Sequence, residues 1–176
     1  MYRKNALLSC IASTSVQHLT SLHSAYLTGR QMHVWDLMRN GLSQSEIARQ
    51  LNITRQAVNQ MVQMIPDRVT AALSDASRLN RLEPRLIDSN RGILVGWSRD
   101  FQTEAVVVLN PKAGLRVWYQ HNLGRCGICP DKKQCKSMLL ESAEELGIPL
   151  TRQERDLHPS KLSSVVFSRA LGRDAN

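Results

Sequence analysis

The sequence predicts an α+β fold in which an N-terminal helical part precedes a small antiparallel sheet, a cysteine-containing turn and C-terminal helices. Between residues 28 and 82, apolar residues recur every three or four positions, the spacing of helices that bury one face. Between residues 92 and 119, three short runs rich in β-branched and aromatic residues have the length and composition of strands. Three cysteines follow at once, and helical spacing then returns.

Two capping boxes are expected to begin the first two helices of the helical part. Thr28 and Gln31 form the first box, and Ser43 and Glu46 form the second. The first helix carries an apolar face and is expected to end at an Asn-Gly pair over residues 40–41. The second helix is short and ends at Asn52, a residue type that tolerates the positive φ of a sharp turn.

A third helix is expected after Thr54, which can cap it, and this helix has an apolar face and a polar face. The polar face has almost no acidic residues and many amides, the side chains that pair bidentately with adenine in the major groove. The alternative is a three-helix bundle whose polar residues are only solvated. The residues expected to contact DNA are Arg49, Thr54, Arg55, Gln56, Asn59, Gln60 and Gln63.

Residues 27–62, LTGRQMHVWDLMRNGLSQSEIARQLNITRQAVNQMV, carry a family resemblance. The run resembles the helix-turn-helix of LuxR-type regulators, of sigma-factor region 4 and of archaeal Tfx-type regulators. The resemblance implies two helices that cross closely at Ala48 and a DNA-reading helix. It places Arg55, Gln56, Asn59 and Gln60 at the base-facing positions.

The rest of the helical part is expected to be a fourth helix that begins at Pro66 and continues to about Leu82. Glu83-Pro84 and the mixed segment after it predict a linker. The predicted organisation is a poorly ordered extension over residues 1–27, a helix-turn-helix domain over 28–83, a linker over 84–91 and a small α+β domain over 92–176.

The expected strands of this second domain are GILVGW, EAVVVL and LRVWY, which begin at Gly92, Glu104 and Leu115. A turn-forming loop separates the last two, so they are expected to pair as antiparallel neighbours. Two helices are expected to follow, one that ends at Gly147 and one from about Ser160 to Leu171.

The last expected strand is followed by one histidine and three cysteines in the pattern H-x4-C-x2-C-x5-C. C-x2-C is a metal-binding step, because two intervening residues let one tight turn direct both thiolates at one ion. The sequence therefore predicts a structural zinc site with a tetrahedral Cys3His ligand set. Its ligands would be His121, Cys126, Cys129 and Cys135.

Two alternatives to zinc remain open for this turn. The C-x2-C-x5-C spacing resembles that of WhiB-type cluster-binding regulators, which would imply a [4Fe-4S] cluster with Cys10 as an upstream fourth ligand. The cysteines could instead be small buried residues or a redox pair, with His121 a polar residue at a strand end.

The charge of the chain favours partners that carry phosphate. Lys and Arg number 23 against 15 Asp and Glu, which gives a net charge of +8, and the pI is near 9.8. No apolar run is long enough to span a bilayer, so no membrane partner is expected. A DNA-binding segment and unpaired cysteines both indicate a cytoplasmic protein.

These observations predict a sequence-specific transcriptional regulator that binds double-stranded DNA, commonly as a homodimer, and that responds to metal or redox state through its cysteines. One alternative is an adaptor similar to sigma region 4, which would contact both the promoter and RNA polymerase. Another is a nucleic-acid-processing enzyme that uses the helix-turn-helix for targeting. The sequence favours no enzyme, because it has no glycine-rich phosphate loop, no H-E-x-x-H and no G-x-S-x-G.

Overall fold

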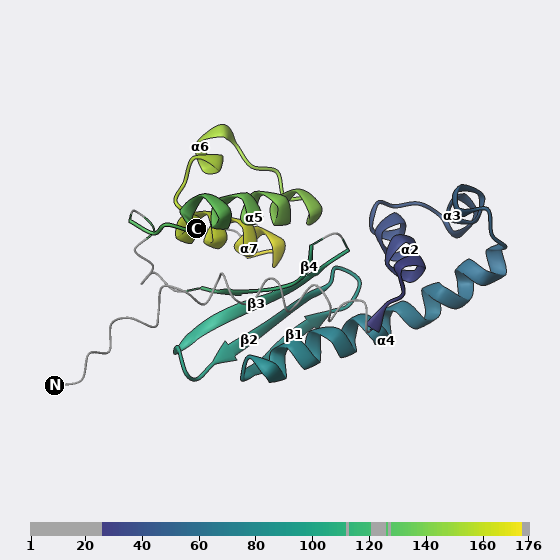
Figure 1. The fold of residues 1–176 in the computed structure, drawn as a ribbon, viewed down its shortest axis with the longest axis horizontal. Coiled ribbons are helices and arrows are strands. Elements are labelled where there is room, and N and C mark those ends of the chain that lie inside the picture. The colour runs from purple at the N-terminus through teal and green to yellow at the C-terminus, as the bar shows by residue number, and fades with distance from the viewer. Residues whose placement is uncertain (1–25, 112, 121–125, 127, 174–176) are drawn as a thin grey trace.

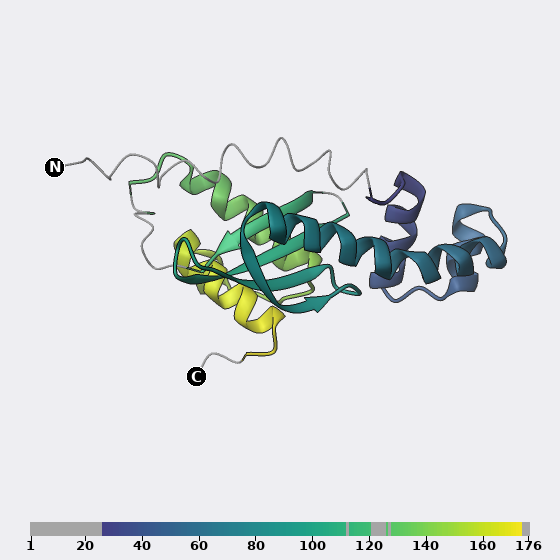
Figure 2. The same ribbon diagram turned by 90° about the horizontal axis from the view of Figure 1, so that it is seen from below.

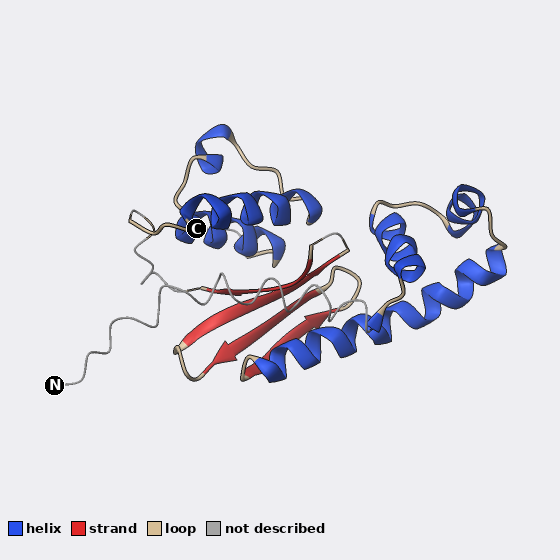
Figure 3. Ribbon diagram, viewed as in Figure 1, coloured by secondary structure: helices blue, strands red, loops and turns tan. Residues whose placement is uncertain are grey.

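A four-stranded antiparallel sheet lies between two helical layers in the computed structural model of the chain (Figures 1 and 3). The structure describes residues 26–111, 113–120, 126 and 128–173. The strands follow one another in the sheet in chain order. They are β1 (Leu82–Asp88), β2 (Ile93–Ser98), β3 (Thr103–Asn110) and β4 (Gly114–Tyr119).

The helical part forms three helices, with α2 and α3 gathered around the first half of α4. Both expected capping boxes are present, and the side chains of Thr28 and Ser43 each accept from the backbone three residues on. Gly41 ends the first helix with φ +83°, as the Asn-Gly pair predicts. The helices are α2 (Gly29–Arg39), α3 (Gln44–Leu51) and α4 (Arg55–Leu79).

The expectation of a new helix at Pro66 is wrong, because α4 runs through this proline without a break. A proline inside a helix removes one backbone hydrogen bond and costs ~3 kcal/mol. Side chains on both sides of the proline offset that cost, since Val58, Ile65, Val69 and Leu73 are all buried along one stripe, and each buried side chain contributes ~1.5–3 kcal/mol. Tertiary packing therefore overrides the local rule, and the helix expected after Thr54 and the helix expected from Pro66 are one continuous helix.

Residues 84–88 of the expected linker form most of β1, an edge strand that pairs only with β2 among the described strands. Pro84 is tolerated there because an edge strand does not need every backbone donor, and the register shifts between Pro84 and Leu86. Leu86 and Ile87 are 48% and 40% exposed. The strand therefore lacks the alternation of buried and exposed residues that would have revealed it in the sequence.

The two faces of the sheet support two separate cores. Leu94 and Val107 are paired in register and belong to the cluster shared with α4, whereas their neighbours Val95 and Val106 belong to the cluster shared with α5 and α7. Figure 2 shows α4 and the C-terminal helices on opposite sides of the sheet. The C-terminal helices are α5 (Lys132–Glu145), α6 (Arg152–Arg155) and α7 (Pro159–Ala170).

The expected helices near residues 138–146 and 160–171 are confirmed as α5 and α7. The short helix α6 was not predicted. It has a capping box formed by Thr151 and Glu154, but it has no buried residue and therefore no apolar periodicity.

The helix-turn-helix and the sheet meet at Trp35 of α2 and Gly92, which directly precedes β2. Trp35 is 2% exposed, and a Cβ at Gly92 would lie 2.7 Å from its ring and 2.6 Å from the backbone oxygen of Leu109. Gly92 also has φ +69°, a conformation that other residues rarely adopt. The close approach joins the helix-turn-helix and the sheet in one apolar cluster.

Only the last two residues of the expected extension over 1–27 are among the described residues, and both are packed. Leu27 is 1% exposed, and the Tyr26 hydroxyl donates to Asp75 on α4. In the part of the chain that the structure describes, no helix has the length and apolar character needed to traverse a bilayer.

Candidate nucleic-acid interface

The turn between α3 and α4 has the backbone that the helix-turn-helix pattern predicts. Asn52 adopts the left-handed conformation with φ 51° and ψ 51°, and the Ile53 N–H donates to the Ala48 carbonyl at 3.0 Å. Ala48 is 7% exposed and lies beside Ile47 and Val58, which are fully buried. Small and apolar side chains thus hold α3 against α4 and fix the angle at which α4 leaves the turn.

The residues predicted to contact DNA are brought together on one exposed surface. Figure 1 shows α3 and the first turns of α4 at the end of the molecule remote from α5 and α7. The seven residues predicted to contact DNA are all exposed: Arg49, Thr54, Arg55, Gln56, Asn59, Gln60 and Gln63. These seven residues are called the reading surface below.

The two guanidinium groups of the reading surface form no close ion pair among the described residues, although the charge of Arg49 acts on Glu46. Neither Arg49 nor Arg55 takes part in an ion pair with any described residue. An exposed, unpaired guanidinium is suited to a phosphate, which it can meet with two parallel N–H···O bonds. The basic groups of this surface are therefore available to an external anion.

Two polar side chains of the reading surface also have partners within the protein. The Thr54 hydroxyl accepts from the Ala57 N–H at 3.1 Å and so caps α4. The Gln44 amide donates to the Asn59 side-chain oxygen at 3.5 Å, a long contact that leaves the Asn59 NH₂ group to face outward. Sequence reasoning missed Gln44, the first residue of α3, because its contact with α4 depends on how the two helices pack.

Glu46 is the acidic residue nearest to this surface on α3, and it is occupied by the cap. Its carboxylate accepts from the Ser43 N–H at 2.8 Å and from the Ser43 hydroxyl at 2.6 Å. These hydrogen bonds lower the pKa of Glu46 below its usual value. The negative charge lies at the N-terminus of α3, where the helix dipole favours it.

The cysteines lie at the start of α5, far along the chain from the reading surface. Cys126 and Cys129 precede the helix and Cys135 lies in its first turns, and all three are partly buried and unpaired. Burial raises the pKa of the Cys135 thiol, and Cys129, Asp131 and Cys126 nearby raise it further. His121 and Cys10, the other candidate ligands, lie outside the described residues.

The described side chains do not by themselves make a metal centre. No three His, Cys, Asp or Glu residues in the ranges that the structure describes are grouped so that they could hold an ion. The charges of Cys126 and Cys129 act on Cys135, but the described cysteines are not grouped as an ion would require. The zinc or cluster site stays a prediction that rests on the sequence.

Residues 12–74 match a family model described as "Putative helix-turn-helix protein, YlxM / p13 like". The match includes α2, α3 and most of α4, and it begins upstream of Thr28. No curated protein and no solved structure matches the chain. The finer resemblance to LuxR-type, sigma-region-4 or Tfx-type proteins stays a prediction, whereas the geometry and the family match agree that the N-terminal part of the chain is a helix-turn-helix domain.

Proposed function

We propose that this protein binds double-stranded DNA in a sequence-specific manner through the first half of α4 and acts as a transcriptional regulator. The observation that carries the proposal is the reading surface itself. Amide side chains from successive turns of an exposed helix lie beside the left-handed turn at Asn52, and unpaired arginines flank them. Amides and arginines are the side chains that most often recognise base edges and phosphates.

The roles of the residues follow from their chemistry and position. Gln56 and Asn59 are one turn apart on α4, so both can reach neighbouring base pairs when the helix lies in the major groove. Arg49 on α3 and Arg55 at the start of α4 are placed to hold phosphates on either side. Phosphate contacts set the register of the protein, and base contacts set its specificity.

The direct test is selection of binding sites from a random duplex library by the purified full chain. A sequence-specific binder enriches one motif, and affinity for that motif should exceed affinity for random DNA by at least about 10³-fold at physiological salt. Recovery of sequences with no common motif would contradict specificity, even if the basic protein retained all of the DNA.

Binding to the selected site, measured with and without RNA polymerase, distinguishes an autonomous regulator from an adaptor similar to sigma region 4. An autonomous regulator binds the site without help, whereas an adaptor needs RNA polymerase to bind with comparable affinity. The homodimer is tested in parallel, because a dimer selects two half-sites with a fixed spacing. We propose no catalytic activity, and incubation of labelled DNA with the protein and Mg²⁺ should leave the DNA uncut.

We also propose that the three cysteines bind zinc, with His121 as the fourth ligand. Support comes from the C-x2-C-x5-C spacing, from the partly buried positions of the three cysteines, and from Lys132, Lys133 and Lys136 in α5, whose charge would offset that of the thiolates. Bound zinc would supply a cross-link between the end of β4 and the start of α5. The alternative, a [4Fe-4S] cluster with Cys10, would give a redox-responsive regulator.

A further inference from the structure

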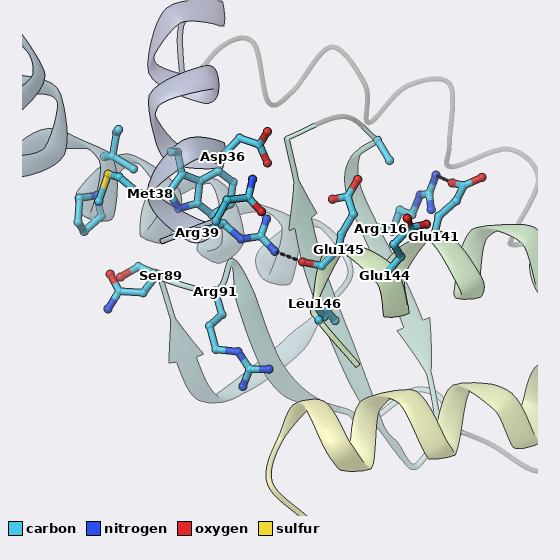
Figure 4. Close-up of a pocket in the computed structure, with 17 residues that line it drawn as sticks. Asp36, Met38, Arg39, Ser89, Arg91, Arg116, Glu141, Glu144, Glu145 and Leu146 are labelled. Atoms are coloured by element: carbon cyan, nitrogen blue, oxygen red, sulfur yellow. Dashed lines mark hydrogen bonds and ion pairs between the residues drawn. The ribbon is translucent and has the colours of Figure 1, made fainter. Parts of the chain in front are cut away.

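A cavity of about 1040 Å³ lies between the helix-turn-helix and the C-terminal helices (Figure 4). Its walls come from the end of α2, the middle of α4, the loops that follow β1 and β3, the start of β4 and the end of α5. This volume is at the upper end of the range for small-molecule sites in proteins. None of the seven residues of the reading surface lines this cavity.

Several charged side chains of the cavity form no ion pair with a described residue. Arg39 on α2 and Arg91 after β1 donate to the backbone oxygens of Glu145 and Ala170, and neither forms an ion pair with a described residue. Glu144 and Glu145, at the end of α5, likewise form none within the described ranges. These four groups form no close ion pair, although the charge of Glu145 acts on Arg39.

Arg39 is a partly buried cation that has donors left for an anionic partner. Its guanidinium lies 5.0 Å over the Trp35 ring, and one of its five N–H donors reaches the Glu145 carbonyl at 3.0 Å (Figure 4). Burial lowers the pKa of Arg39, and Arg91 acts in the same direction, while Glu145 and Asp36 oppose it. A carboxylate bound to the remaining donors would repay the cost of burying this cation.

A simple anion does not fit the whole cavity. Three arginines line it against four carboxylates: Arg39, Arg91, Arg116, Asp36, Glu141, Glu144 and Glu145. Arg116 and Glu141 pair with each other at 3.1 Å, whereas the other three carboxylates form no ion pair with a described residue. Apolar atoms of Met38, Pro66 and Leu146 complete the lining. A ligand with an anionic end, a cationic end and an apolar part satisfies all three features.

We propose that this cavity binds a free α-amino acid, with its carboxylate on Arg39 and its ammonium group on Glu144 and Glu145. The ligand would bridge the helix-turn-helix and α5, which are otherwise joined, among the described residues, by the single hydrogen bond from Arg39 to the Glu145 carbonyl. Ligand binding at this cavity does not depend on the DNA-binding function proposed above.

The test measures ligand binding to the full chain without DNA. Thermal melting is recorded with each standard amino acid in turn, and calorimetry then gives the affinity for any amino acid that raises the melting temperature. At least one should do so. Its affinity should fall at least about tenfold, or 1.4 kcal/mol, in Arg39→Gln and in Glu144→Gln, and it should be unchanged in Arg152→Gln, an exposed arginine on α6 outside the cavity.

Two further arms make the test decisive. Glu144 is exposed, so its variant should fold even if loss of Arg39 disturbs the packing on Trp35. The amine and the carboxylic acid that correspond to the bound amino acid should each bind at least about tenfold more weakly, because each lacks one charged end. Absence of any stabilising amino acid, or equal affinity in all variants, would overturn the proposal.

Discussion

At the scale of single residues, Arg49 shows how a phosphate contact differs from a base contact. It is exposed on α3 and forms no ion pair with a described residue. Arg49→Ala should therefore weaken binding to selected and random DNA by the same factor and lower the slope of log K against log salt by ~1. Fluorescence anisotropy over a salt series measures both effects. A loss confined to the selected site would place Arg49 on a base instead.

A second prediction for a single residue concerns Gly92 and the free energy of unfolding. Gly92→Ala would combine a backbone cost of roughly 1–2 kcal/mol for positive φ with an overpacking cost of roughly 1–3 kcal/mol, because its Cβ would meet Trp35 and the Leu109 oxygen. Gly41→Ala is the matched control, since Gly41 has φ +83° but open space around it. Urea denaturation should show a clearly larger loss at Gly92, and equal losses would mean that Trp35 does not pack there.

At the scale of elements, the turn between α3 and α4 depends on one left-handed residue. Asn52→Gly should leave the free energy of unfolding nearly unchanged, because glycine adopts φ 51° without strain. Asn52→Val should cost roughly 1–2 kcal/mol, because a β-branched side chain resists this conformation. Thermal melts of the two variants check the difference. A valine variant as stable as the glycine variant would show that the turn has another backbone.

The cysteine turn before α5 is the other element with a direct test. If zinc is bound, metal analysis of the purified chain should give about one ion per chain, and Cys126→Ser or Cys129→Ser should remove it. The sheet should survive this loss, because the two cores on its faces contain no cysteine. A brown chromophore that is lost in air would favour the cluster, and in that case Cys10→Ser should also abolish it. Protein with neither metal nor chromophore would mean that these partly buried cysteines bind neither group.

At the scale of the whole molecule, local chemistry explains which parts could be predicted from the sequence. The caps at Thr28 and Ser43 and the turn at Asn52 are encoded by neighbouring residues, so the helix-turn-helix could be predicted. Strands β2, β3 and β4 could be predicted as well, because their β-branched runs are bounded by turn residues. The exposed reading surface follows directly from the polar face of α4.

The features that could not be predicted depend on contacts between distant parts of the chain. The local preference of proline predicts that a helix is interrupted at Pro66, but burial of Ile65 and Val69 on the same stripe keeps α4 continuous. Edge strand β1 is exposed and contains Pro84, so it carries no periodic signal. The cavity draws its charges from α2, β4 and α5, and no local pattern unites them.

The central claim, that the first half of α4 reads DNA sequence, is tested most directly by the ratio of affinities for selected and random DNA. Fluorescence anisotropy at one salt concentration gives this ratio for the wild type, Gln56→Ala, Asn59→Ala and the control Gln153→Ala, an exposed glutamine on α6. We expect Gln56→Ala and Asn59→Ala each to lose about 1–3 kcal/mol on the selected site and little on random DNA. Gln153→Ala should keep the wild-type ratio. An unchanged ratio in both reading-surface variants would contradict the account.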